Sequence, residues 1–246
     1  MRTDSYFDNS PLASSGLPSK NELELLNVWK DEIPAEVFTE TFTPPITDGS
    51  GNDRKNLLKA KEILEKEGWF VEDGKLVKDG KEFKFEFLIV SPSDEKIALA
   101  YQSNLKKLGI TMDVRTVDSS QYQERLLSYD FDMIKRYWGV SLSPGNEQQF
   151  YWGSEVGQKD GSRNYPGINS PAVDALIEKL ISATNREELT TAIHALDRVL
   201  LWGHYVVPLY HSNKDRIAYW DFFEYPDEIP LYGIVIESWW INKDKQ

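Results

Sequence analysis

The chain has 246 residues, 40% of them hydrophobic, so it can bury the core of one large domain or of two small ones. It carries 28 Lys and Arg against 40 Asp and Glu, and this net charge of −12 repels phosphate backbones and argues against nucleic-acid binding. Because it contains no cysteine, disulfides, thiolate zinc sites and Cys nucleophiles are excluded.

The first 52 residues predict mostly irregular structure. Proline and glycine interrupt them repeatedly, and only residues 22–28 have a short helical pattern. A tract of this length without regular structure is unusual inside a domain, so it is expected to lie along something else. We therefore divide the chain into an irregular lead-in segment (1–35), an α/β lobe (36–208) and a tail (209–246).

Regular structure is predicted to begin with a helix that Asn52 or Asp53 caps and Gly68 ends. Turn signals follow at Asp73-Gly74 and Asp79-Gly80. Alternating apolar residues then predict a strand over 83–89.

Two more strands are expected after it. Helical spacing over 97–108 is followed by a strand at 110–114, and tight connections favour a parallel pair with 83–89. A helix at 119–128 then leads into a short strand at 131–137.

The second half of the chain changes in character. Residues 139–167, rich in glycine and aromatic residues, predict a long loop of the kind that lines sites. Ser170-Pro171 opens one amphipathic helix, and Asn185 with Glu188 resembles a capping box that opens another. The tail is predicted to contain strands at 205–210 and 216–220.

Catalytic and cofactor motifs are scarce. There is no glycine-rich phosphate cradle, and the three histidines match no short metal spacing. The segment 48–53 resembles a calcium loop but lacks its required glycine and its terminal glutamate. Asp130 and Asp132 form an acidic pair beside no evident cleft. We therefore predict no catalytic residue, no metal and no cofactor.

A binding site is predicted where the strand at 131–137 ends. Ligands gather beyond the carboxyl ends of strands in open α/β sheets, and the loop here offers hydroxyls, an amide and a carboxylate beside aromatic walls. The alternative is a merely structural junction between strand and loop. The candidates are Arg136, Tyr137, Trp138, Gly139, Ser141, Ser143, Asn146 and Glu147.

Several segments, in this order and spacing, resemble the bacterial extracellular solute-binding proteins of family 5, the peptide-binding subunits of ABC importers. The loop at 138–147 is most similar to the YejA-type branch. The segments are TPPITDG at 43–49, EGW at 67–69, LKKLGI at 105–110, FDM at 131–133, WGVSLSPGNE at 138–147, YWG at 151–153, GSRN at 161–164, SPAVDALI at 170–177 and VVPLY at 206–210.

The resemblance implies a class II periplasmic-binding-protein fold, in which two α/β lobes enclose the ligand. Complete members are longer than this chain, which would then be a C-terminal portion: one mixed-sheet lobe flanked by helices, with tail strands that return to a missing N-terminal lobe. We expect no leader segment at the start of this portion, and we expect the complete protein in the periplasm. We further expect weak ligand binding by this chain alone and exposed apolar surface at residues 234–236 and 239–240.

Several peptide-binding relatives fix the ligand's amino group with an aspartate shortly after the tryptophan equivalent to Trp138. This chain has Ser141 or a neighbour there, which leaves Glu147 as a substitute acceptor, while Arg136 can meet a carboxylate. Tyr210 and His211 match a family strand that faces the cleft and are lesser candidates.

The leading hypothesis is a receptor that closes around peptides or peptide-like solutes and passes them to inner-membrane ABC permease subunits. Alternative ligands are oligosaccharides stacked on Trp138 and Trp152, or a metal chelate. The alternative of a different class is a hydrolase that uses acidic residues. The lack of a nucleophile–base constellation favours the receptor.

Overall fold

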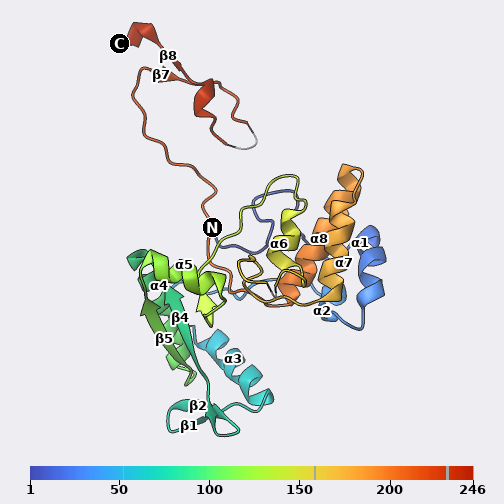
Figure 1. The fold of residues 1–246 in the computed structure, drawn as a ribbon, viewed down its shortest axis with the longest axis vertical. Coiled ribbons are helices and arrows are strands. Elements are labelled where there is room, and N and C mark those ends of the chain that lie inside the picture. The colour runs from blue at the N-terminus through green and yellow to red at the C-terminus, as the bar shows by residue number, and fades with distance from the viewer. Residues whose placement is uncertain (52, 158, 231–232, 246) are drawn as a thin grey trace. The chain divides into compact units, whose positions relative to one another are not determined.

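The computed structural model describes residues 1–51, 53–157, 159–230 and 233–245. The chain divides into two compact units, Ser5–Val206 on one side and Met1–Asp4 with Val207–Gln246 on the other. The division places most of the predicted lead-in segment inside the larger unit, and Figure 1 shows the elements of both.

A three-stranded parallel sheet forms one part of the larger unit. Its strands are β4 (Lys84–Ile89), β5 (Thr111–Thr116) and β6 (Met133–Ile134), in the order β5-β4-β6. The predicted parallel pairing of the first two is confirmed. The third is shorter than the predicted 131–137: before it begins, the Asp132 carboxylate and not a backbone carbonyl accepts the Glu86 N–H, at 2.8 Å, and it ends at Ile134.

Helices cover both faces of this sheet. α4 (Pro92–Lys106) leads from β4 to β5, and α5 (Ser119–Leu127) leads from β5 to β6. Neighbouring strand residues point to opposite faces, so Phe87 packs in the cluster of α4 whereas Leu88 packs in the cluster of α5. The two helices therefore lie on opposite faces of the sheet.

An antiparallel hairpin sheet lies in the same unit, separate from the parallel sheet. It contains β1 (Phe70–Glu72), β2 (Lys75–Lys78) and β3 (Lys81–Glu82) and follows α3 (Arg54–Lys66). Both predicted turns are present, with positive φ at Asp-Gly pairs 73–74 and 79–80. Asp53 caps α3 through the Asn56 N–H, whereas Asn52 lies outside the described residues.

A helical core occupies the rest of the unit and has α8 (Arg186–Trp202) at its centre. α7 (Pro171–Ile181), α1 (Lys20–Leu26) and α2 (Glu36–Thr39) pack against it (Figure 1). A 3₁₀ turn, Asn27–Trp29, follows α1. Ser170 and Asn185 cap α7 and α8 as predicted. However, the Glu188 carboxylate accepts hydrogen bonds from Thr184 and not from the Asn185 backbone, so the second cap is not a reciprocal box.

From Ser5 onward, the N-terminal segment is part of this core. The predicted domain boundaries at residues 35 and 208 stay a prediction. Phe7, Leu12 and Leu26 are almost fully buried against the helices. Ser19 and Glu22 form a capping box that starts α1. What this segment lies along is α8 of the same chain.

Two charged residues of α8 hold the segment in place. The Asp197 carboxylate accepts hydrogen bonds from Ser5 Oγ, Tyr6 N and both N and Oγ of Ser14. The Arg198 guanidinium donates to Glu22 at 2.6 Å and to the carbonyls of residues 15, 16 and 17. Side chains of α8 thus provide hydrogen bonds for backbone groups of this irregular segment, which has no neighbouring strand to provide them.

The smaller unit has little regular structure. It contains the antiparallel pair β7 (Phe223–Glu224) and β8 (Trp240–Ile241) and the 3₁₀ turns Ile236–Ser238 and Lys243–Lys245. The strands predicted at 205–210 and 216–220 are absent from the described residues, apart from one bridge between Arg2 and Tyr210. An apolar alternation does not make a strand without a neighbour to complete its hydrogen bonds.

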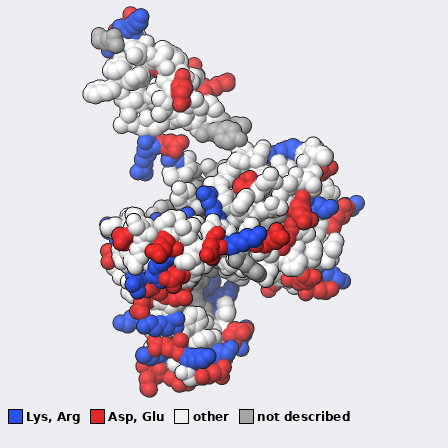
Figure 2. Space-filling view, in the orientation of Figure 1, with Lys and Arg blue, Asp and Glu red and all other residues white. Residues whose placement is uncertain are grey.

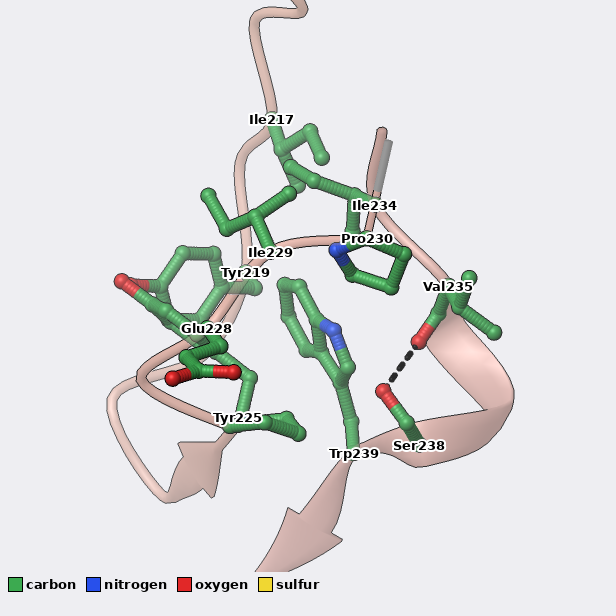
Figure 3. A pocket seen from close by; sticks show the side chains of 11 residues that line it. Ile217, Tyr219, Tyr225, Glu228, Ile229, Pro230, Ile234, Val235, Ser238 and Trp239 are labelled. Carbon is green, nitrogen blue, oxygen red and sulfur yellow. Dashed lines mark hydrogen bonds between the residues drawn. The ribbon is translucent and has the colours of Figure 1, made fainter. Parts of the chain in front are cut away.

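Aromatic residues form a small cluster in this unit. The rings of Tyr219, Tyr225 and Trp239 lie 4.9–5.8 Å apart, centroid to centroid, and line a cavity of about 90 Å³ (Figure 3). The predicted exposure at 234–236 and 239–240 holds for Val235, Ile236 and Trp240, whereas Ile234 and Trp239 are half-buried and line the cavity.

Candidate functional site

The carboxyl edge of the parallel sheet carries the candidate site. The order β5-β4-β6 reverses direction at β4, because the chain moves from β4 to one neighbour and then crosses to the other. In open α/β sheets such a reversal places ligands beyond the carboxyl ends of the strands. Arg136 lies two residues beyond the end of β6, at this edge.

Arg136 is exposed, and tyrosines surround its guanidinium. Its Nη2 donates to the Tyr165 hydroxyl at 3.1 Å, and its Cζ lies 4.9 Å from the centroid of the Tyr165 ring. Tyr122 of α5 is also near: burial raises the pKa of its phenol, and the Arg136 charge opposes that shift. The guanidinium therefore has a defined position but keeps access to solvent.

The two aromatic residues after Arg136 have different environments. Tyr137 is 88% exposed. Trp138 is partly buried, its ring 4.9 Å from that of Trp152, and its indole N–H donates to the Arg163 carbonyl. Trp152 is 2% exposed and so cannot stack on an oligosaccharide as the alternative hypothesis requires.

The loop after Trp138 is held mainly by its own backbone and side chains. The Tyr151 hydroxyl donates to the Gly139 carbonyl, and the Ser141 hydroxyl accepts the Ser143 N–H at 3.1 Å. Asn146 is exposed and immediately precedes α6 (Glu147–Trp152). This helix lies inside the predicted loop 139–167, where the frequent glycines hide its single turn and a half.

Glu147 is engaged within this loop. Both of its carboxylate oxygens accept the Gly145 N–H at 3.0 Å, and one also accepts from the Gln148 side chain at 3.2 Å. A carboxylate at the first turn of a helix is also stabilised by the helix dipole. The structure therefore gives Glu147 a local role in forming the turn before α6.

Tyr210 and His211 belong to the smaller unit. Tyr210 is 68% exposed and bridges to Arg2, and His211 exchanges backbone hydrogen bonds with Met1 and contacts the Thr3 hydroxyl. Eight of the ten candidates thus lie on the segment 136–147. The other two, Tyr210 and His211, contact the first three residues of the chain.

Sequence reasoning missed Tyr165 and its neighbour Asn164. Asn164 is fully buried: its amide donates to the carbonyls of Gly153 and Ile168 and its oxygen accepts the Ile168 N–H. The signal for this residue was its position in the segment 161–164, among glycines in a polar loop. Its hydrogen bonds link two distant parts of the loop, which no local pattern predicts.

The acidic pair has structural partners as well. Asp130 pairs with Arg125 at 2.8 Å, and the Asp132 carboxylate accepts the Glu86 N–H of the central strand β4. Among the residues that the structure describes, no group of three or more His, Asp or Glu is placed to hold a metal ion. Within the same residues, no helix has the length and apolar character needed to cross a membrane. In the view of Figure 2, positive and negative side chains lie interspersed.

The family model for the middle part of the bacterial extracellular solute-binding proteins, family 5, matches residues 28–160, which is more than half of the chain. This chain belongs to that family. A match of this extent agrees with the resemblance seen in the sequence and includes the whole segment that carries the candidate site.

Two curated relatives extend the similarity over nearly the whole family 5 chain. An uncharacterized protein, y4wM, from Sinorhizobium fredii is 49% identical over 98% of the chain and 37% of its own length. A probable peptide-binding protein, YejA, from Agrobacterium fabrum is 43% identical over 99% of the chain and 40% of its own length. The chain therefore spans about two fifths of the curated relatives it matches.

Among solved structures, the oligopeptide-binding protein AppA from Bacillus subtilis, in complex with a nonapeptide, resembles this chain with a TM-score of 0.61. The two are 23% identical, and the alignment covers 91% of this chain and 45% of AppA. This likeness shows the fold, which is the mixed α/β fold of class II periplasmic binding proteins that the sequence predicts.

Proposed function

We propose that this family 5 chain contributes one side of a binding site for peptides or peptide-like solutes in an ABC importer. The observation that supports it most directly is the position of Arg136, an exposed cation fixed beyond the carboxyl edge of the parallel sheet. Family membership and the similarity to the probable peptide-binding protein YejA support peptides as the ligand class.

The ligand group that suits the surroundings of Arg136, called the Arg136 corner below, is a carboxylate. A guanidinium binds a carboxylate through two parallel hydrogen bonds, whereas a peptide amine needs an acceptor. Glu147, the predicted acceptor, accepts its hydrogen bonds from its own loop. In the proposed complex the peptide's carboxyl end or an acidic side chain meets Arg136, and Tyr137 with the loop hydroxyls of Ser141 and Ser143 contacts its backbone.

The proposed mechanism is closure without chemistry. Ligand binding stabilises a closed state because only that state contacts the ligand from both sides. The partners in this proposal are a second lobe and the inner-membrane permease subunits, and the location is the periplasm. No step of it uses a catalytic group, a metal or a cofactor.

The test is to identify what the complete protein retains. The protein is purified from its native periplasm, its mass is measured under non-denaturing conditions, and the released ligand is sequenced by fragmentation. We expect peptides, and Arg136→Gln should lower their occupancy about tenfold, the value of one strong charge-assisted pair. Retention of an oligosaccharide or a metal chelate, or no loss in the variant, contradicts the proposal.

A further inference from the structure

We propose that Tyr165 is a positioning residue that holds the Arg136 guanidinium ready for a ligand carboxylate. The proposal rests on the proposed function, and it names a carboxylate as the ligand group that the Arg136 corner selects. It concerns a residue outside the segment 136–147, placed beside Arg136 only by the fold.

Two contacts from one tyrosine fix the arginine. The Tyr165 hydroxyl accepts from Arg136 Nη2 at 3.1 Å, and the guanidinium carbon lies 4.9 Å from the centroid of the same ring. An exposed arginine otherwise samples many rotamers, and that freedom is lost when it binds a ligand. A guanidinium held in one place before binding has already lost it.

Tyr165 can do this because its own loop is rigid. The adjacent Asn164 is fully buried, and three side-chain hydrogen bonds connect it to Gly153 and Ile168. The Tyr165 ring also lies 6.3–6.4 Å, centroid to centroid, from the rings of Tyr129, Phe131 and Trp138. The aromatic neighbours restrict the ring on several sides.

The backbone at Tyr129 adds to this arrangement. Tyr129 has φ of +55°, a left-handed conformation that costs energy for a bulky side chain. Its hydroxyl hydrogen-bonds with Ser162, three residues before Tyr165. The strained residue thus anchors the same loop that carries the positioning tyrosine.

The local charges favour an anionic partner for Arg136. The Glu147 carboxylate is engaged by the Gly145 N–H, and the nearby Lys135 ammonium pairs with Asp94 at the start of α4. The Arg136 contacts, in contrast, are with neutral tyrosine groups, which leave its full positive charge for the ligand.

The first experiment compares ligands with and without the carboxylate. The complete protein is unfolded, freed of bound ligand and refolded, and calorimetry measures the Kd of tri-alanine and of its C-terminal amide. We expect the acid to bind about tenfold more tightly than the amide. In Tyr165→Leu the preference should fall to about twofold or less, and Tyr165→Phe, which keeps the ring, should lie between.

Tyr101→Phe is the matched control, because Tyr101 lies on α4 and packs in a different core cluster from Tyr165. Loss of its hydroxyl should leave the preference for the acid over the amide unchanged. A Tyr165→Leu protein that folds and discriminates as well as the wild type overturns the proposal. Equal binding of acid and amide by the wild type overturns the carboxylate assignment.

The second experiment needs no ligand. Nitrogen-15 relaxation of the Arg136 Nε–Hε group reports the order of its side chain in the unliganded protein. We expect high order in the wild type, lower order in Tyr165→Phe and the lowest in Tyr165→Leu. Equal order in all three overturns the positioning role. If the wild type binds neither peptide, the proposed function fails, and the relaxation data still decide the role of Tyr165.

Discussion

Asp197 of α8 accepts two hydrogen bonds from Ser14, one from its backbone N–H at 2.9 Å and one from its hydroxyl at 2.7 Å. The carboxylate is completely buried, 183 residues away from Ser14 in the chain. Together with the contacts to Ser5 and Tyr6, it ties the irregular N-terminal segment to the last long helix.

Replacing this carboxylate should destabilise the larger unit. Asp197→Asn puts a donor where donors already converge, and we expect a loss of about 3 kcal/mol in the free energy of unfolding. Ser14→Ala removes only the hydroxyl and should cost about 1 kcal/mol. Urea denaturation followed by tryptophan fluorescence measures both. Equal stability of wild type and Asp197→Asn would show that the segment is not held by this residue.

The same carboxylate predicts a pH dependence. Burial raises the pKa of Asp197 above its ordinary value of 3.8 by more than its hydrogen bonds lower it. The folded state therefore binds its proton more tightly than the unfolded state does. Its contribution to stability is full below pH 3.8 and is lost as the pH rises through the folded-state pKa.

The measurement is a series of urea unfolding curves from pH 4 upward. The wild type should lose stability relative to Asp197→Asn as the pH increases through that window, and the difference should level off above it. A difference between the two proteins that stays constant with pH would contradict the assignment.

Arg198 offers a second test of the same segment. Arg198→Met leaves the buried Glu22 carboxylate without its cation and three carbonyls without their donor, and we expect a loss of about 3–5 kcal/mol. The double variant Arg198→Met with Glu22→Gln removes both charges and should cost less than the sum of the single changes. Strict additivity in denaturant unfolding would show that the two side chains do not interact.

Alanine substitutions at two glycines with almost the same φ distinguish the cost of backbone strain from the cost of steric crowding. Gly109 has φ of +78°, and a Cβ there would lie 2.8 Å from the Leu76 backbone nitrogen. Gly49 has φ of +77° and open space around it. Gly49→Ala should cost about 1 kcal/mol, the penalty of the left-handed conformation. Gly109→Ala should cost about 3 kcal/mol because the backbone must also move. Equal losses in thermal unfolding would rule out the close approach.

The turn before α6 predicts a result at the candidate site. Glu147→Gln keeps the size of the side chain but weakens its bonds to Gly145, so peptide affinity should change by about threefold or less, whereas Arg136→Gln should lower it about tenfold. Calorimetry with tri-alanine on the complete protein measures both. A larger loss in Glu147→Gln than in Arg136→Gln would make Glu147 the ligand's partner.

Local patterns in the sequence determined the elements whose cause is local. The alternation before Ile89, the Asp-Gly turns and the caps at Ser170 and Asn185 depend on residues a few positions apart, so they could be predicted. A strand that ends near Arg136 could be predicted for the same reason, although the predicted strand 131–137 contained Arg136 and the structure ends it at Ile134. The resemblance added the family.

The tertiary structure alone decided what depends on residues far apart in the chain. Ser5 and Ser14 meet Asp197, and Arg136 meets Tyr165, because packing brings together segments between 29 and 192 residues apart. The same holds for what is missing: residues 205–210 have a strand-like pattern, but only the end of this run, at Tyr210, bridges to another segment, and no strand forms. Glu147 shows the remaining case, since only the folded loop decides whether a carboxylate faces a ligand or its own backbone.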